Sequence, residues 1–375
     1  MKRKEFYALG IMSGTSLDGL DLSLIKSDGK AKVNIIQTRY FKFDKKMKIL
    51  LHDLILKSRN IDVNLIEKNK LFKFVNLKFS EYLIKKIKLF FLSSKCKIER
   101  VSVLGIHGNT IIHSPRNKKS IQLGDYKLIS KTLKIPIIHD FRSRDIMLGG
   151  EGAPLVPIFH KAIFSQKNKR IFVINIGGVS NFTYLNGKNK FIAGDIGPGN
   201  TLIDNYCLKN FNMDFDKDGL LAKKGNVDFE LVKKWLKRKI FNKDFPRSYD
   251  VSDFDITKFL GSNFLSANDC LRTLTFFSAK LISQLKFVFR HEVDYWIFAG
   301  GGVKNKTLME DLKKLLNVNE LLTSENFGFD SCYLEASAFA YISIRTLIGL
   351  PSAFPNTTGC LKKNICGEIF FPEFI

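Results

Sequence analysis

The stretch that decides the fold is GIMSGTSLDGLDLSLIKSDG, at residues 10–29. An apolar, strand-like run at residues 6–12 stops at the turn SGTS, and a second strand-like run at residues 20–25 follows at once. Glycine lets a backbone come close to a ligand and point several N–H groups at it. A turn of glycine and hydroxyl residues between two apolar strands therefore predicts a β-hairpin whose turn binds phosphate.

The same pattern returns in the second half of the chain. An apolar run at residues 171–176 breaks at GGVSN, residues 177–181. Strand-like runs at residues 182–185 and 190–193 then lead into GDIGPGN, residues 194–200. A strand, a small-residue turn and a returning strand that occur twice indicate a weak internal duplication.

The remaining chain alternates between helical and strand-like periodicity, which predicts an α/β fold. Helices are expected at residues 46–58, 65–92, 201–211, 229–239, 271–289, 308–316 and 334–347, and further strands at residues 33–43, 100–106, 135–139 and 295–298. The glycine-rich loop at residues 149–154 has the composition of a domain junction. The expected division is residues 1–136 with 341–375 as one domain and residues 137–340 as the other.

Composition narrows the class of protein. A chain of 375 residues with 45% hydrophobic content is long enough for two globular domains of ordinary size. No apolar run approaches the roughly 20 residues of a membrane-spanning helix, and the apolar run after the basic N-terminus is too short for a signal peptide. A cytoplasmic location is expected. The six cysteines include no C-x-x-C pair, so neither a zinc site nor a redox motif is supported.

The net charge of +24 raises the hypothesis of a nucleic-acid or anionic-membrane binder. The lysines and arginines are scattered, however, and no tract of five or more occurs. Lysine, asparagine, isoleucine and phenylalanine are all abundant, which is typical of compositional drift. We therefore expect no nucleic-acid and no membrane partner.

Three glycine-rich turns follow predicted strands, at residues 13–19, 177–181 and 300–305. The chain contains no G-x-x-x-x-G-K-[ST] motif and no G-x-G-x-x-G motif that opens a helix after a strand, so a P-loop and a Rossmann site are unsupported. A hairpin type of phosphate loop remains. In the first turn, Thr15 and Ser16 can donate hydroxyl hydrogen bonds, and Asp18 or Asp21 can hold Mg²⁺ directly or through water.

Nine ordered motifs between about residue 8 and residue 369 resemble the anhydro-N-acetylmuramic acid kinase family. They are GIMSGTSLDGLD, GIHGNTIIHSP, IQLGD, DFRSRD, GGEGAPLVPIFH, NIGGVSNFT, GDIGPGNTLID, AGGGVKN and LEASAFAYISIRTLIGLP. The resemblance implies a two-domain fold of the sugar-kinase, actin and heat-shock ATPase type, with duplicated mixed β-sheet cores and an interdomain cleft. It also implies a cytoplasmic homodimer.

The implied reaction uses ATP, Mg²⁺ and water. The enzyme opens the bridge of 1,6-anhydro-N-acetylmuramic acid and phosphorylates O6, which gives N-acetylmuramic acid 6-phosphate and ADP in peptidoglycan recycling. Asp195 matches the catalytic base that takes a proton from the attacking water. Without the resemblance, an aspartate in this motif is more typical of a turn cap than of a catalytic base.

The resemblance also implies binding roles for other residues. The ATP and Mg²⁺ contacts are Gly14, Thr15, Ser16, Leu17, Asp18, Gly19, Leu20, Asp21, Gly177, Gly178, Gly300, Gly301, Gly302 and Asn305, with Asp18 as the metal ligand. The sugar contacts are His107, Asn109, Thr110, Arg142 and Glu335, the first three on an expected strand-end loop.

Several of these positions have alternative interpretations. Arg142 and Arg144 are either partners for the substrate carboxylate or surface ion-pair residues with Asp140 and Asp145. Glu335 is either a substrate contact or a helix-start charge. His113 and His160 are more typical of hydrogen-bonded structural residues than of catalysts.

The chain departs from the family pattern at several positions. The family usually has Gln where Asn109 and Glu151 stand and Thr where Ile196 stands. Its Lys-Ser-Thr-Gly-Arg-Glu stretch appears here only as PRSYD, at residues 246–250. Three alternatives stay open: a related sugar kinase with another substrate, a nucleotide-binding protein with reduced turnover, and a nucleic-acid binder.

Overall fold

The computed structural model describes the chain except for residues 1–3, 15–16, 189, 261–264, 290–291 and 373–375. It divides into two compact units, residues 1–163 with 333–375 and residues 164–332. This division differs from the predicted boundaries after residues 136 and 340. The difference arises because β6 (Ile137–His139) pairs with β4 of the first sheet and because the whole of α12 (Leu334–Leu347) belongs to the first unit.

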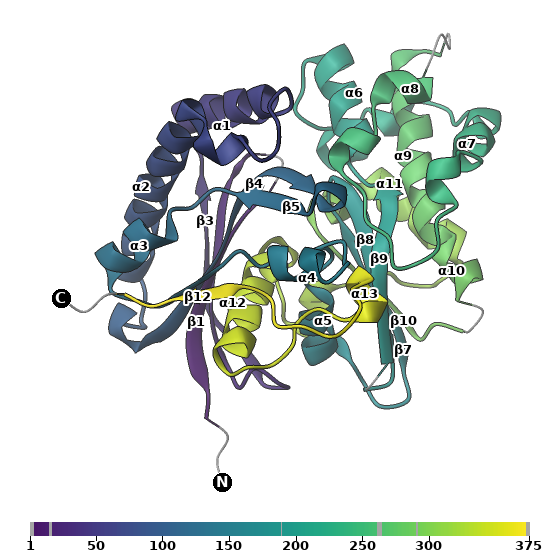
Figure 1. The fold of residues 1–375 in the computed structure, drawn as a ribbon. Helices are drawn as coiled ribbons and strands as arrows, with labels where there is room; N and C mark the ends of the chain where they lie inside the picture. The colour runs from purple at the N-terminus through teal and green to yellow at the C-terminus, as the bar shows by residue number, and fades with distance from the viewer. Residues whose placement is uncertain (1–3, 15–16, 189, 261–264, 290–291, 373–375) are drawn as a thin grey trace. The chain divides into compact units, whose positions relative to one another are not determined.

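The first unit contains one sheet and the helices that cover it (Figure 1). Its strands are β1 (Phe6–Ser13), β2 (Gly19–Ser27), β3 (Val33–Lys42), β4 (Val101–Ser114), β5 (Lys119–Gln122), β6 (Ile137–His139) and β12 (Glu368–Phe370). Its helices are α1 (Lys45–Ser58), α2 (Lys70–Leu92), α3 (Tyr126–Leu133), α4 (Ser143–Met147), α5 (Pro157–Phe164), which ends on the first residue of the second unit, α12 (Leu334–Leu347) and α13 (Pro355–Thr358). Short 3-10 turns lie at η1 (Ile66–Lys68), η2 (Ile98–Arg100) and η3 (Pro115–Asn117).

The strands of the first sheet follow the order β12-β6-β4-β1-β2-β3, with β5 paired to β4. The strands β1, β2 and β3 form an antiparallel meander, whereas β4 lies parallel to β1 and β6 lies parallel to β4. Apolar side chains of β1 and β2 pack with α1 and α2 in one buried cluster.

Helix α12 packs closely against β1, β2 and β4 at glycines (Figure 1). A Cβ atom on Gly10 would lie 1.9 Å from the Ala336 carbonyl oxygen, and one on Gly105 would lie 2.7 Å from the Phe339 carbonyl oxygen. The hydroxyls of Ser23 and Ser337 are hydrogen-bonded at 2.7 Å in the same buried layer. The glycines are therefore required by the close approach of helix and sheet.

The second unit contains the other sheet. Its strands are β7 (Arg170–Ile176), β8 (Val179–Asn186), β9 (Lys190–Pro198), β10 (Tyr295–Ala299) and β11 (Leu322–Thr323). Its helices are α6 (Thr201–Phe211), α7 (Phe229–Leu236), α8 (Ile256–Leu260), α9 (Ala267–Ser283), α10 (Leu285–Val288) and α11 (Lys306–Leu316). Its 3-10 turns are η4 (Lys217–Gly219), η5 (Ala222–Lys224), η6 (Lys239–Phe241), η7 (Val251–Asp253), η8 (Gly301–Lys304) and η9 (Ser324–Phe327), and η10 (Ser331–Tyr333) crosses into the first unit.

The second sheet repeats the topology of the first. Its order is β11-β10-β7-β8-β9, with an antiparallel meander β7-β8-β9 and with β10 parallel to β7 and β11 parallel to β10. The α/β class and the internal duplication are confirmed, because each unit has the same meander followed by two parallel strands. The predicted interdomain cleft stays a prediction.

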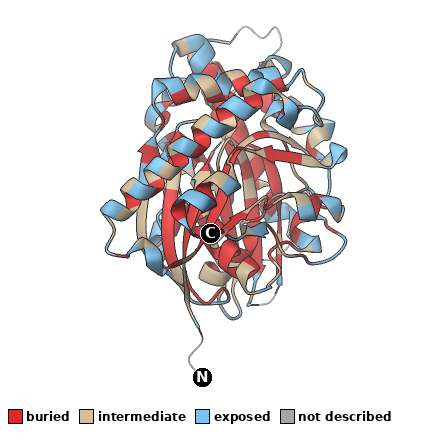
Figure 2. Cartoon of the chain, turned by 60° about the vertical axis from the view of Figure 1, so that its left-hand side comes forward, coloured by how far each residue is buried: buried red, intermediate tan, exposed pale blue. Residues whose placement is uncertain are grey.

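Burial is concentrated in the strands and in the inward faces of the helices (Figure 2). In the second unit, side chains of β7 and β8 pack with α6, α7 and α9 in one cluster rich in aromatic rings. Phe172, for example, stacks on Trp296 with ring centroids 4.6 Å apart. The abundant phenylalanines thus serve the core.

Candidate active site

The C-terminal ends of parallel strands meet at one edge of each sheet, which is where ligands bind in open α/β sheets. In the first unit, β1 ends at Ser13, and its register pairs Ser13 with Asn109 of β4. The hairpin turn that begins at Gly14 therefore lies beside β4. The predicted phosphate turn occupies the edge where this chemistry is expected.

Asn109 braces this turn. Its side-chain Nδ2 donates to the Ser13 hydroxyl at 3.0 Å and to the Gly14 carbonyl at 3.1 Å. The side chain is fully buried, and its Oδ1 has no hydrogen-bond partner among the described residues. A buried acceptor without a partner is costly unless a ligand or water satisfies it.

The predicted phosphate-binding residues of the first unit differ in exposure. Thr15 and Ser16 lie outside the described residues. Leu17 has a left-handed backbone with φ of 56°, and its N–H donates to the Gly14 carbonyl at 3.3 Å. The Leu20 side chain packs in the core, so only its main chain can meet a ligand.

Two carboxylates lie next to the turn. Asp18 is exposed and forms an ion pair with the Lys48 ammonium at 3.3 Å. Asp21 is on β2, opposite Tyr40 of β3. The pKa of Tyr40 is raised by burial and then by Asp18 and Asp21, so both carboxylates lie close to this phenol. Gly19 leaves no room for a side chain, because its Cβ would lie 2.4 Å from the Phe41 carbonyl oxygen.

The structure corrects the prediction that His107, Asn109 and Thr110 lie on a loop after a strand. They lie inside β4, which continues to Ser114 through an irregularity in its pairing with β1. Gly108 has φ of +73°, and a Cβ there would lie 1.9 Å from the Leu123 carbonyl oxygen. Such bulges re-aim side chains and are frequent next to active sites.

The half-buried Arg142 contacts the buried His107. The Arg142 guanidinium donates to His107 Nε2 at 3.0 and 3.1 Å and to the Gly152 carbonyl at 2.9 Å. Because Nε2 accepts, we assign the imidazole proton to Nδ1, which donates to the Gly108 carbonyl at 3.1 Å. Burial, and then the Arg142 charge, lowers the pKa of His107 well below its usual value. A neutral imidazole therefore orients a cationic guanidinium.

The other sugar-contact candidates are on neighbouring elements. Thr110 is half-buried and lies opposite Gln122 of β5. Glu335 is half-buried in the first turn of α12. Asp145 is not a surface ion-pair residue, since its buried carboxylate accepts hydrogen bonds from Thr358 at 2.8 Å and from Gly152 N–H at 2.9 Å.

The second unit places its glycine turn at the equivalent edge. Gly177 and Gly178 join β7 to β8, and their carbonyls accept hydrogen bonds from the Asn200 and Gly199 N–H groups, both at 2.8 Å. A Cβ on Gly199 would lie 2.4 Å from the Gly177 carbonyl oxygen, so the end of β9 packs directly on this turn. The motifs at residues 177–181 and 194–200 are therefore brought together.

The third glycine turn packs on the end of β7. Gly300 has φ of +84°, and Gly302 lies against Ile176. Gly301, in contrast, has no heavy atom within 4 Å of a built Cβ and no left-handed backbone. Asn305 is the N-cap of α11, since its Oδ1 accepts a hydrogen bond from the Leu308 N–H at 3.0 Å. This structural role is separate from the contact to adenosine that the sequence predicts.

Asp195 lies inside β9 rather than in the turn after it, because β9 continues to Pro198 and pairs Asp195 with Asn181. The side chain is 6% exposed. Its Oδ2 accepts hydrogen bonds from the Tyr249 N–H at 2.8 Å and from the Ser248 hydroxyl at 3.2 Å. A buried carboxylate with donors on one oxygen has the fixed orientation that a general base requires.

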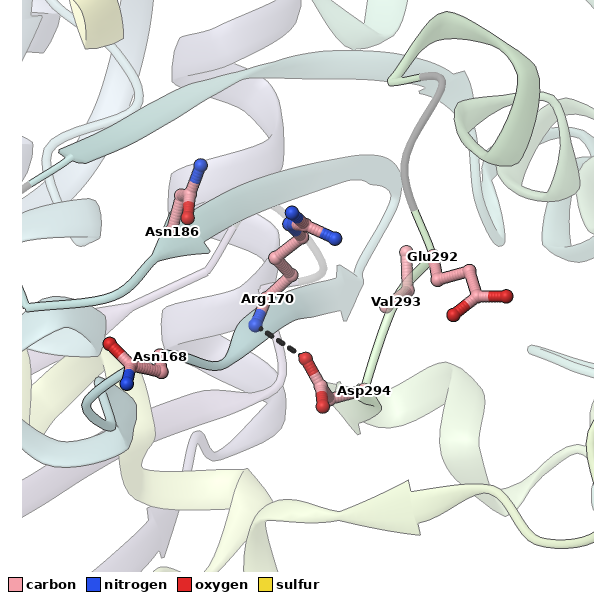
Figure 3. Close-up of a pocket in the computed structure, with 6 residues that line it drawn as sticks. All are labelled: Asn168, Arg170, Asn186, Glu292, Val293 and Asp294. Carbon is pink, nitrogen blue, oxygen red and sulfur yellow. Dashed lines mark hydrogen bonds between the residues drawn. The ribbon is translucent and has the colours of Figure 1, made fainter.

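A separate pocket in the second unit lies at the opposite edge of the sheet, where β7 begins and β8 ends (Figure 3). The residues that line it are Asn168, Arg170, Asn186, Glu292, Val293 and Asp294. The Arg170 N–H donates to Asp294 Oδ2 at 2.8 Å. Since none of the predicted site residues lines this pocket, we do not assign it to the active site.

The sequence profile of one family, described as anhydro-N-acetylmuramic acid kinase, matches residues 6–372. The chain belongs to this family. Membership in a kinase family implies the use of ATP. The anhydro-N-acetylmuramic acid kinase of Rhodopseudomonas palustris strain CGA009 is 34% identical, over 94% of this chain and 95% of that protein.

Other relatives give the same result. The anhydro-N-acetylmuramic acid kinase of Rhodopseudomonas palustris strain BisB18 is 34% identical over 97% of this chain and 100% of that protein. Among solved structures, component A of the (R)-2-hydroxyglutaryl-CoA dehydratase of Acidaminococcus fermentans is similar with a TM-score of 0.44 and 13% identity, covering 90% of this chain and 99% of that one. At this low similarity, the fold description rests on the two sheets of the present chain.

The structure also shows the surroundings of two positions where the sequence analysis expects a departure from the family pattern. Ile196 is buried, and its carbonyl accepts a hydrogen bond from Arg247 at 3.1 Å. Ser248 and Tyr249, in the segment at residues 246–250, provide the donors to Asp195. Sequence reasoning missed these contacts, and no pattern in the PRSYD segment indicates them.

Described residues include no cluster of three or more His, Cys, Asp or Glu side chains arranged to hold a metal ion. No helix in the described ranges is long and apolar enough to cross a membrane. None of the six cysteines is in a disulfide, and all except Cys332 are buried.

Proposed function

We propose that this family member cleaves the anhydro bridge of 1,6-anhydro-N-acetylmuramic acid and phosphorylates the released O6 with ATP. The products are N-acetylmuramic acid 6-phosphate and ADP, a step of peptidoglycan recycling. Family membership over nearly the whole chain supports the reaction. The single structural observation that carries it is Asp195, a buried carboxylate with one oxygen fixed by two donors.

Asp195 acts as the general base. It takes a proton from a water molecule as this water attacks the anomeric carbon, and the bond from this carbon to the bridging O6 breaks. The electron pair of this bond makes O6 the nucleophile for the γ-phosphoryl group. The remaining acceleration comes from positioning and from neutralisation of charge.

The residues present fit ATP. Gly301 has open space where a side chain would be, and the nearest heavy atom to a Cβ on Gly177 is 3.4 Å away. Neither glycine has a left-handed backbone, so neither packing nor backbone conformation requires glycine at these two positions. Close approach of a ligand would require it. Gly14–Asp21 and Gly177–Gly178 are assigned to the phosphates, and Gly300–Gly302 and Asn305 to the adenosine.

Mg²⁺ is the expected metal, with Asp18 as its ligand and Asp21 as a neighbour. Magnesium in kinases is held by one or two carboxylates together with substrate phosphates, so a cluster of three protein ligands is not needed. When bound, the ion neutralises charge on the β- and γ-phosphates. Asp18 is exposed, and its carboxylate forms an ion pair with Lys48; because an exposed ion pair is weak, a cation can replace it at little cost.

The sugar contacts are assigned to His107, Asn109, Thr110, Arg142 and Glu335. The guanidinium that His107 orients suits the lactyl carboxylate of the substrate, because arginine presents a planar fork to a carboxylate. The buried Oδ1 of Asn109 suits a sugar hydroxyl or an ordered water. A cytoplasmic homodimer is part of the proposal, and light scattering of the purified protein measures its mass.

A coupled ADP-release assay with Mg²⁺-ATP tests the function. The wild type should release ADP with 1,6-anhydro-N-acetylmuramic acid and not with N-acetylmuramic acid, and Asp195→Asn should abolish this release. Release with both sugars would contradict hydrolytic ring opening. Release only with another sugar from a panel of anhydro and free sugars would identify a related kinase.

A further inference from the structure

We propose that the segment at residues 245–249 positions the catalytic base, with the Ser248 hydroxyl and the Tyr249 N–H together fixing Oδ2 of Asp195. This inference rests on the proposed function, because it assumes that Asp195 is the base. It gives a role to the PRSYD segment at residues 246–250.

The segment lies directly along β9. The Arg247 carbonyl accepts a hydrogen bond from the Asp195 N–H at 2.8 Å. This is the kind of main-chain hydrogen bond that a neighbouring strand would make. A Cβ on Gly194 would lie 2.8 Å from the Phe245 ring and 3.3 Å from the Arg247 nitrogen. Glycine before the base thus permits the approach that brings Ser248 and Tyr249 within hydrogen-bonding distance of its carboxylate.

The Arg247 side chain fastens this segment to the sheet. Its guanidinium donates to the carbonyls of Asp195 at 2.9 Å, Ile196 at 3.1 Å, Phe241 at 2.8 Å and Lys243 at 2.6 Å. It also lies over the Phe245 ring, 4.4 Å from its centroid. The Arg247 guanidinium thus connects the main chain of β9 with the main chain at residues 241–243. These hydrogen bonds hold Ser248 and Tyr249 at a fixed distance from Asp195.

The hydrogen bonds act on the ionised form of Asp195, since a carboxylate accepts both. They fix the rotation of the carboxylate and hold it ready for a proton on its reacting oxygen. Arg247 and Tyr249 also interact with Asp195 electrostatically. Burial raises the pKa of Tyr249 to about 12 and lowers that of Arg247.

Of the two donors to Asp195, only the Ser248 hydroxyl can be removed by substitution without changing the main chain. Ser248 therefore gives a sharper test than Tyr249. The variants are Ser248→Ala, which loses the hydroxyl, and Ser248→Thr, which keeps one. Ser252→Ala is the matched control, because Ser252 is exposed and its side chain makes no hydrogen bond given among the described residues. Asp195→Asn is included to test the base itself.

All variants are assayed by coupled ADP release with 1,6-anhydro-N-acetylmuramic acid across the pH range, and thermal unfolding is recorded for each. Ser248→Ala should lower kcat about tenfold with the KM for ATP unchanged, because one charge-assisted hydrogen bond is lost. The acidic limb of its kcat/KM profile should move to higher pH, because the ionised carboxylate has lost a donor. Ser248→Thr should restore both values to within about twofold.

The outcomes separate the two proposals. If Asp195→Asn is inactive while Ser248→Ala matches the wild type in kcat and pH profile, the positioning role is wrong and the base assignment stands. If Asp195→Asn keeps full activity, the base assignment fails and the positioning role fails with it. A Ser248→Ala variant that loses activity and thermal stability together, with no shift of the pH profile and no rescue in Ser248→Thr, would show a structural role only.

Discussion

The two units share one sheet topology but differ at the turn after their first strand. In the first unit, five residues separate β1 from β2; they include the carboxylate of Asp18, and the Asn109 side chain donates to the Gly14 carbonyl among them. In the second unit, the turn after β7 is two glycines braced by main-chain N–H groups. The third strands differ too, since β9 contains Asp195 whereas β3 contains no acidic residue.

The difference shows how one duplicated sheet topology can provide two chemically different sites. The backbone supplies similar glycine turns at equivalent edges of both sheets. Side chains then distinguish the two turns, with candidate metal-binding carboxylates beside the first and the buried Asp195, the proposed base, beside the second.

The largest expected effect is on Asp195, the proposed base, which lies in the second unit. Asp195→Asn should lower kcat about 10³-fold and leave the KM for ATP within about threefold, because a general base contributes to the chemical step rather than to nucleotide binding. The ADP-release assay measures both values. Asp214→Asn, an exposed aspartate of the same unit, is the control and should match the wild type.

The next effect contrasts two kinds of glycine. Gly10→Ala should lower the free energy of unfolding by about 3 kcal/mol, because its Cβ would lie 1.9 Å from the Ala336 carbonyl oxygen. Gly301→Ala should unfold like the wild type, because no heavy atom of the described residues lies within 4 Å of its Cβ, and it should raise the KM for ATP roughly tenfold if the nucleotide occupies that space. Denaturant unfolding and steady-state kinetics measure the two quantities. Unchanged ATP affinity in Gly301→Ala would remove the argument for a nucleotide at this turn.

A smaller effect concerns the brace of the first turn. Asn109→Ala removes two hydrogen bonds, to Ser13 and to Gly14, and should lower the free energy of unfolding by about 2 kcal/mol. The KM for ATP should rise more than kcat falls if the turn holds phosphate. A variant with weakened sugar binding and normal ATP binding would assign Asn109 to the substrate alone.

Acid should affect the first unit before the second. His107, His139 and His160 are all in the first unit and have lowered pKa values, about 4 for His139 and about 3 for His160, chiefly through burial. Below pH 6.5 the unfolded chain binds protons that the folded unit does not, so stability falls as the pH falls towards 4. The described part of the second unit contains no histidine.

The smallest expected change isolates one of these histidines. His139→Phe keeps a ring to stack on Tyr126, whose centroid lies 3.6 Å away, and removes the titrating group. The slope of stability against pH between 6.5 and 4 should decrease by up to about 1.4 kcal/mol per pH unit. Hydrogen exchange follows the first unit, and the fluorescence of Trp235 and Trp296 follows the second. An unchanged slope would place the acid sensitivity elsewhere.

Periodicity predicted most of the fold, and for α6 and α12 it predicted the ends as the structure has them. It failed where strands continue through glycine. β4 and β9 extend past His107 and Asp195 because bulges keep the strands paired beyond Gly108 and Gly194, and local patterns do not reveal partners. Helix α2 begins later than expected because Asn69 caps it.

The candidate site shows the same division between local and distant information. The glycine turns and Asp195 follow from motifs, since each is contiguous in the sequence. The Asn305 cap, the pairing of His107 with Arg142 and the donors to Asp195 from residues 248 and 249 depend on tertiary contacts. The roles assigned to all of these residues stay predictions until the variants are measured.

The close seat of α12 on Gly10 and Gly105 has a consequence for synthesis of the chain. The first unit is assembled from both ends of the sequence, whereas residues 164–332 are continuous. On the ribosome the second unit can fold as soon as it emerges, but the glycine face of the first sheet stays uncovered until residues 334–347 follow. At roughly 5–20 residues per second, the time between synthesis of β4 and synthesis of α12 is on the order of ten seconds or more. The N-terminal sheet is therefore the part of the nascent chain that a chaperone would need to shield.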